Sequence, residues 1–155
     1  MKDLINCLWF DNQGLEAARY YTGIFPNSAI TTQLDLDSLG HPASEPLTVE
    51  FHLKGRPFVA LNGGPLFTFN ESISFQIMCE NQAEVDYYWG ELTAGGQESQ
   101  CGWLKDRFGV SWQVVPTRMV ELLSDPDPEI ARRVTEAFMT MKKLDIGVLE
   151  AAARG

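Results

Sequence analysis

The chain has 155 residues, 45% of them hydrophobic, which is typical of one globular domain with a substantial core. Its 21 acidic residues outnumber 12 basic ones and give a formal net charge of -9, so nucleic acid is disfavoured as a partner, because phosphate binding requires clustered lysine and arginine. No apolar stretch approaches the roughly 20 residues that cross a bilayer, so the sequence predicts no membrane partner.

The first half of the chain predicts a strand, a helix and three further strands. Alternating bulky residues predict a strand over 4–10, and turn residues then lead into a helix over 14–24. That helix carries Leu15, Ala18, Tyr21 (or Tyr20) and Ile24 on one apolar face. Further strands are predicted over 29–36, 47–53 and 58–62, with an irregular loop over 38–46.

The second half predicts the same order of elements, followed by a helical extension. A strand is expected over 72–78, a helix over 81–94, and strands over 97–101, 102–106 and 110–115. The extension, about 126–153, begins with acids and prolines and carries an apolar stripe: Ile130, Val134, Phe138 and Met141. A tail containing Leu144, Val148 and Leu149 extends that helix, and the stripe docks either on its own domain or on a partner subunit.

The two halves are an internal repeat. Residues 16–24 align with residues 84–92, about 68 residues later, and each aligned segment begins with glutamate and carries adjacent aromatic residues. One such unit is too small to bury a core alone, so two must pack together and leave a cleft. The sequence therefore predicts an α+β fold of two βαβββ modules, about 1–66 and about 70–118, within one domain of residues 1–155.

Three cysteines, Cys7, Cys79 and Cys101, are widely spaced and form no Cys-x-x-Cys pair. Their odd number and spacing predict free thiols in a reducing compartment, so we expect a cytoplasmic protein. Residues 1–3 include an acid and lead into no long apolar segment, which predicts no signal peptide.

The chain resembles the glyoxalase/bleomycin-resistance (vicinal oxygen chelate) superfamily, and within it the demethylubiquinone methyltransferase-like branch. The segments that carry the resemblance are LWFD at 8–11, YYTGIFPNS at 20–28, FVALNGGP at 58–65 and CGWLKDRFGVSWQVVP at 101–116. The resemblance implies a duplicated glyoxalase-like fold and a homodimer, for which the C-terminal stripe suits an exchanged or clasping arm. It leaves the activity open, because this scaffold hosts enzymes and non-catalytic binding proteins.

Methyl transfer from S-adenosylmethionine is disfavoured by the residues themselves. That chemistry usually relies on a glycine-rich turn between a strand and a helix, and the sequence shows no such segment. Residues 63–65, Gly-Gly-Pro, cannot open a helix. We therefore expect no cofactor.

A metal site is disfavoured as well. The resemblance places four ligands at Ile5 (or Asn6), Ala60, Ser72 and Gln113. Divalent ions need imidazole or carboxylate ligands to replace their hydration, and none of these residues supplies one. We expect no bound metal.

The expected lining of the cleft is polar and aromatic. If Phe75 and Ile77 pack beneath their helix, alternation turns the intervening residues the other way, toward the cleft. The predicted ligand-binding residues are Cys7, Trp9, Asn62, Ser72, Ser74, Gln76, Trp103 and Gln113. Amides, hydroxyls and indoles suit a polar or aromatic small molecule, unless they simply bond to each other or to water in a closed interior.

Two further groups have side chains that are capable of catalysis. Cys101 near Lys105 and Arg107 could be an activated nucleophile, but no histidine lies nearby, and a small residue at a strand bend is favoured. His52 and Glu50 share one strand face as a potential acid–base pair, although such pairs are more often solvated. Catalytic residues therefore remain unknown.

The sequence predicts a metal-free small-molecule-binding protein. The alternative is a metal-independent enzyme on the same scaffold, acting on a small polar or aromatic substrate. A third possibility is an interaction module whose C-terminal stripe docks on another protein.

Overall fold

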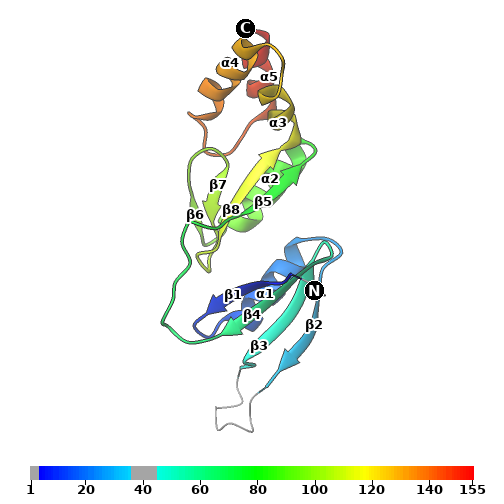
Figure 1. Cartoon of the computed structure of the whole chain (residues 1–155), viewed down its shortest axis with the longest axis vertical. Helices are drawn as coiled ribbons and strands as arrows, with labels where there is room; N and C mark the ends of the chain where they lie inside the picture. Colours follow the sequence, from blue (N-terminus) through cyan, green and yellow to red (C-terminus); the bar gives the residue numbers. More distant parts are fainter. Residues whose placement is uncertain (1–3, 36–44) are drawn as a thin grey trace. The chain divides into compact units, whose positions relative to one another are not determined.

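The computed structural model describes residues 4–35 and 45–155, which divide into two compact units, Met1–Phe69 and Asn70–Gly155. Each unit has one four-stranded mixed sheet with a helix packed on it (Figure 1). The predicted α+β class with two βαβββ modules is confirmed. Most of the predicted 38–46 loop, with His41, lies outside the described residues, as do residues 1–3.

The first unit follows the order strand, helix, three strands. Its elements are β1 (Asn6–Phe10), α1 (Gly14–Ile24), β2 (Ala29–Leu34), β3 (Thr48–Leu53) and β4 (Arg56–Asn62). The sheet order is β1-β4-β3-β2, with β1 parallel to β4 and the other pairs antiparallel. The helix boundaries agree with the predicted 14–24.

The core of the first unit lies between α1 and one face of this sheet. Val49, Phe51 and Leu53 alternate along β3 and are all buried, as their spacing predicts. Tyr21 of α1 is fully buried and stacks on Phe51, with ring centroids 6.3 Å apart. Phe51 in turn stacks on Phe58 of β4.

The second unit repeats this order with shorter strands. Its elements are β5 (Phe75–Cys79), α2 (Gln82–Thr93), β6 (Gln97–Glu98), β7 (Trp103–Lys105) and β8 (Ser111–Pro116), in the sheet order β5-β8-β7-β6. Val85 and Leu92 of α2 pack over a buried strand face that includes Leu104, Trp112 and Val114.

One buried carboxylate fixes the turn between β7 and β8. Asp106 is only 3% exposed, and its Oδ1 accepts hydrogen bonds from the backbone N–H groups of Phe108 and Val110. Its Oδ2 accepts a third bond from Trp112 Nε1, at 2.8 Å. Asp106 therefore connects the turn to the core and sets where β8 begins.

Three helices follow β8: α3 (Thr117–Leu123), α4 (Pro128–Phe138) and α5 (Ile146–Arg154). The sequence predicted α4 but not α3. A proline after the predicted 110–115 strand indicates the end of that strand, and in the structure Pro116 also occupies the N-cap position of α3. The tail does not extend α4. Asp145 caps a separate helix, its side chain accepting a hydrogen bond from Val148 N.

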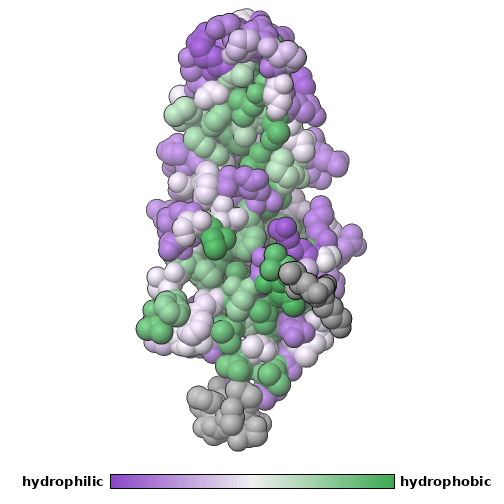
Figure 2. Space-filling model, viewed as in Figure 1, coloured by the Kyte–Doolittle hydropathy of each residue, from purple (hydrophilic) through white to green (hydrophobic). Residues whose placement is uncertain are grey.

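The C-terminal apolar stripe is covered within its own unit. Val134 is fully buried with Leu122 of α3 and Leu149 of α5, and the rest of the stripe packs against this cluster: Ile130, Phe138 and Met141. An exchanged arm is therefore not needed to cover it. In Figure 2 hydrophilic residues surround these helices and a hydrophobic area shows between them; Val120 of α3 and Val148 of α5 are 45% and 49% exposed. Within 4–35 and 45–155, no helix has the length and apolar character needed to span a membrane.

Replacing Asp106 with alanine should lower the free energy of unfolding by about 3 kcal/mol or more, because three donors in the core lose their acceptor. Urea denaturation measures this. Asp127→Ala is the control. It removes an exposed helix cap and should cost only about 1 kcal/mol. Equal losses in the two variants would contradict the role given to Asp106.

Candidate functional site

The face of the second sheet opposite α2 presents a row of polar and aromatic side chains. Gln76 of β5 pairs in register with Gln113 of β8, and Gln113 pairs with Trp103 of β7. Side chains of directly paired residues lie on the same face of a sheet. The structure thus brings together three residues that the sequence assigned to one lining, from three different strands.

Hydrogen bonds organise this row. Gln113 Nε2 donates to Ser74 Oγ at 2.7 Å, and Gln76 Nε2 donates to Gln113 Oε1 at 3.2 Å. Ser72 does not take part in this row of hydrogen bonds. It lies before β5 and bonds instead to Asn70 Oδ1 in a local turn. An amide has two N–H donors and two acceptor lone pairs, so Gln113 can also bond to a ligand.

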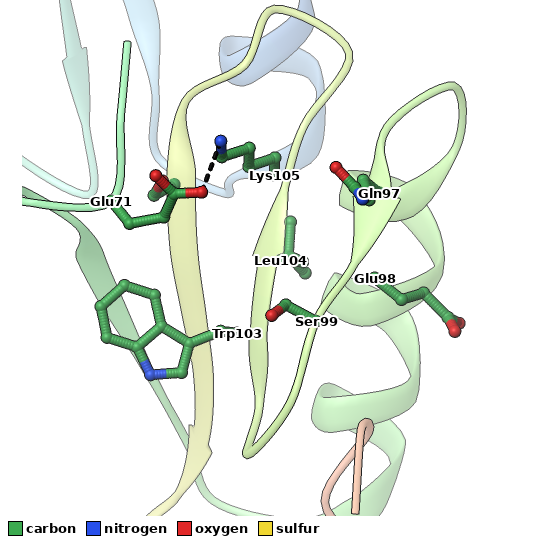
Figure 3. A pocket seen from close by; sticks show the side chains of 8 residues that line it. Glu71, Gln97, Glu98, Ser99, Trp103, Leu104 and Lys105 are labelled. Carbon is green, nitrogen blue, oxygen red and sulfur yellow. Dashed lines mark ion pairs between the residues drawn. The ribbon is translucent and has the colours of Figure 1, made fainter.

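A hollow of about 300 Å³ adjoins this row, at the edge of the sheet formed by β6 and β7 (Figure 3). We call it the second-unit hollow. The residues that line it are Glu71, Gln97, Glu98, Ser99, Trp103, Leu104, Lys105 and Ser111.

An ion pair lies across the second-unit hollow. Lys105 Nζ is 2.5 Å from Glu71 Oε1, and the two side chains point toward one another in Figure 3. The hydrogen bond from Lys105 lowers the pKa of Glu71. The sequence reasoning missed both residues as site members. Alternation from Trp103 could have identified Lys105, whereas Glu71 lies outside the strands and gave no such signal.

Glu98 belongs to the opposite side of the same strands. It pairs in register with buried Leu104, and its Oε1 accepts a hydrogen bond from Trp89 Nε1 of α2 at 3.1 Å. Gln97, in contrast, pairs with Lys105. The charges that face the hollow are therefore those of Lys105 and Glu71.

In the first unit, Cys7 and Trp9 share the face of β1 opposite to buried Leu8 and Phe10. Cys7 is exposed, yet partial desolvation raises the pKa of its thiol, so the thiol is protonated at neutral pH and is a weak nucleophile. Trp9 Nε1 donates to Gly64 O at 2.8 Å, and its ring meets Phe67 edge-on.

Asn62 does not share this face, which corrects the sequence expectation. It pairs with Phe10, and by alternation it belongs with buried Phe58 and Ala60 on the side of α1. Its Oδ1 accepts from Gly14 N at 2.8 Å, and its Nδ2 donates to Pro46 O at 2.9 Å. Asn62 thus anchors the start of α1, a structural task.

A second hollow, of about 580 Å³, lies in the first unit. Its residues are Ile5, Thr31, Glu50, Phe51, His52, Gly55, Pro57, Phe58 and Val59. Glu50 and His52, which the sequence offered as a potential acid–base pair, both line this hollow from β3.

Cys101 lies in a tight turn between β6 and β7. Its φ is 58° and that of Gly102 is 82°, and Trp103 N donates to Gln100 O across the turn. Two consecutive positive φ angles characterise a two-residue hairpin turn. This geometry supports the interpretation of Cys101 as a small residue at a bend.

The positions that the resemblance assigns to a metal do not fit one. Ile5 has no ligating atom, and Ala60 lies on the α1 side rather than beside Cys7, whose register partner is Val59. The Gln113 amide is neutral and bonded to Ser74 and Gln76. In the described ranges, no three His, Cys, Asp or Glu side chains gather in a metal-binding arrangement.

The model of one protein family, 3-demethylubiquinone-9 3-methyltransferase, matches residues 2–115 of this chain. Among solved structures, the PhnB protein from Bacillus cereus is similar, with 27% identity and a TM-score of 0.67, over 74% of this chain and 99% of that one. No curated protein sequence matches significantly.

Two further solved structures share the fold. A protein from Pseudomonas aeruginosa is 18% identical, with a TM-score of 0.62, over 75% of this chain and 98% of that one. The fosfomycin resistance protein FosX from Listeria monocytogenes is also 18% identical, with a TM-score of 0.53, over 81% and 99%. At this identity the likeness establishes the fold alone, which is glyoxalase-like.

Asn62→Ala should lower the free energy of unfolding by about 1–3 kcal/mol, because Gly14 N–H and Pro46 C=O lose their partner. Thermal or urea unfolding measures the change. Exposed Asn12 provides the control, and Asn12→Ala should change stability by less than about 0.5 kcal/mol. If Asn62→Ala were as mild as this control, the anchoring role would be wrong.

The Glu71–Lys105 ion pair should be lost at low pH and not at high pH within the range where Lys105 stays charged. Since the folded-state pKa of Glu71 is lowered, the pair is intact above the ordinary glutamate pKa of about 4.3 and is lost as pH falls through the lowered value. NMR titration of Glu71 should show this lowered pKa in the native protein and a higher pKa in Lys105→Met, in which only the backbone hydrogen bond of Glu71 still lowers it. The same pKa in both proteins would contradict the pairing.

Proposed function

The chain belongs to the 3-demethylubiquinone-9 3-methyltransferase (PhnB-like) family of the glyoxalase/fosfomycin-resistance superfamily, and we propose that it binds a small polar or aromatic molecule without a resident metal ion. The observation that carries the proposal is the second-unit hollow. An indole and an ion pair line this hollow, and the hydrogen-bonded Ser74, Gln113 and Gln76 lie beside Trp103 on the same sheet.

The chemistry of this hollow favours a ligand without net charge. Half-buried Trp103 offers an aromatic surface for stacking. Lys105 and Glu71 neutralise one another at 2.5 Å, so neither sign of charge predominates. A single anion would face Glu71 and a net charge of -9, and a single cation would face Lys105. An uncharged or zwitterionic aromatic compound avoids both conflicts.

Methyl transfer, despite the family name, is not what we propose. In α1 and α2, the helices packed on the two sheets, a backbone donor of the first turn already has a partner. Gly14 N–H of α1 bonds to Asn62, and Glu84 N–H of α2 bonds to Asn81 Oδ1. The Glu84 carboxylate also lies at that terminus and accepts from Glu80 N. Neither terminus is therefore suited to the carboxylate or phosphate of a nucleotide-derived cofactor.

Metal-free binding is proposed from the donor set. A neutral glutamine that is already hydrogen-bonded, an alanine and an isoleucine cannot replace the hydration of a divalent ion. Cys7 adds little, because its raised pKa keeps the thiol protonated.

A metal-independent enzyme is the second candidate function. The observation that favours it is the hollow of about 580 Å³ in the first unit. Glu50 and His52 line one hollow together with apolar Ile5 and Val59, which places a carboxylate and an imidazole beside surface that an organic substrate would contact. Chemical conversion of any bound compound would favour this candidate over simple binding.

A homodimer remains part of the proposal. The C-terminal stripe does not support dimerisation, because it packs against other residues of the same unit. Exposed apolar residues after β4, Leu66 and Phe67, are 73% and 59% exposed and suit contact with another copy.

Binding is tested by thermal shift with four probes of similar size: nicotinamide, phenylalanine, benzoate and benzylamine. The uncharged and zwitterionic probes should raise Tm by about 2–4 °C, and the two ions by less. Trp103→Ala should weaken binding about tenfold, because stacking is lost. Tyr87→Ala is the matched control. It removes an aromatic residue of α2 that is 45% exposed and does not line the hollow, and it should leave the affinity unchanged.

Two results would overturn this proposal. One is that no probe shifts Tm, or that the ions shift it as much as the neutral compounds. The other is that Trp103→Ala binds as tightly as the native protein, which would place any ligand away from the second-unit hollow.

A further inference from the structure

Residues 141–146, which run from the loop after α4 to the first residue of α5, bond to the tip of the β6–β7 hairpin. Cys101 N donates to Met141 O and Gly102 N donates to Lys142 O, both at 2.8 Å. We call residues 141–146 the strap. These two bonds satisfy the backbone N–H donors of Cys101 and Gly102, the two turn residues with positive φ angles.

Packing adds to this contact. Leu144 of the strap is fully buried, and a Cβ on Gly102 would lie only 3.0 Å from Leu144 Cδ1. Gly102 is therefore needed both for its φ and for the close approach of Leu144.

The far end of the strap is fixed to α2 by one amide. Gln82 Nε2 donates to Leu144 O at 3.2 Å, and Gln82 Oε1 accepts from Ile146 N at 2.9 Å. Two ion pairs flank these bonds: Lys143 with Asp86 of α2 at 2.6 Å, and Lys142 with Glu98 of β6 at 3.5 Å. The strap thus joins α2 to the hairpin.

Apart from the strap, the hairpin tip bonds to β8, where Val114 N donates to Gly102 O at 2.8 Å. β6 is only two residues long and β7 three, and a short two-stranded hairpin is marginally stable alone. The same hairpin supplies Gln97, Ser99 and Trp103 to the second-unit hollow.

We infer that the strap positions the hairpin wall of the second-unit hollow and so sets its affinity for ligand. The affinity part of this inference rests on the proposed function. The strap lies beyond residue 115, where the family match ends, so residues outside the matched region hold the hairpin that forms the wall.

Gln82→Ala tests the inference, because it removes both bonds that fix the far end of the strap. Amide hydrogen exchange in the ligand-free protein should accelerate about tenfold at Cys101 and Gly102, and also at Ser99 and Trp103 in the wall. The control is Arg132→Ala, which breaks the α4 pairs with Glu129 and Glu136 and should leave hairpin exchange unchanged.

A second readout uses thiol labelling. Cys101 is partly exposed beside the strap, whereas Cys7 is exposed in the other unit and serves as an internal control. In Gln82→Ala, iodoacetamide should label Cys101 faster than in the native protein and Cys7 at the native rate. Nicotinamide, or whichever of the four probes binds the native protein, should bind Gln82→Ala about tenfold more weakly.

Three outcomes would overturn the inference: unchanged exchange at Cys101 and Gly102, acceleration confined to those two residues while Ser99 and Trp103 keep their native rates, or unchanged probe affinity despite faster exchange. If no probe binds the native protein, the proposed function fails, and the exchange and labelling data still decide whether the strap positions the wall.

Discussion

Each four-stranded sheet of this protein packs one long helix against one face, and strand alternation then dictates what the other face presents. In the second unit, Leu104, Trp112 and Val114 are buried on the α2 side. Trp103, Lys105 and Gln113 alternate with them and must point the opposite way. The candidate site is thus a direct consequence of how the core is packed. A substitution that shifted the register by one residue would remove it.

Periodicity predicted much of this fold because the strands and helices have strong patterns. A helix was predicted at about residues 14–24, where α1 lies, and alternation around Phe75 and Ile77 predicted the direction of Gln76. Asn62 was misplaced because its face depends on how β4 pairs with β1, and a parallel register between distant segments is not visible in one sequence. Glu71 was missed because it lies in a loop without period, where only the fold brings it to Lys105.

The C-terminal extension shows the same limit in another form. The stripe of Ile130, Val134 and Phe138 indicated burial, but a stripe does not specify what covers it. In the structure α3 and α5 supply the cover. α3 itself was missed because Pro116, which ends β8, is equally compatible with the start of a helix. The extension then contacts the second sheet through residues 141–146, at a place that no local pattern marks.

The central claim is that the open face of the second sheet binds a neutral or zwitterionic aromatic ligand without metal. The most direct measurement is NMR of the Trp103 indole N–H and of the Gln76 and Gln113 side-chain amides, titrated with nicotinamide in the presence and absence of EDTA. The account predicts shifts at all three groups that EDTA does not alter. Shifts that disappear with EDTA, or that occur only in the first unit, would contradict it.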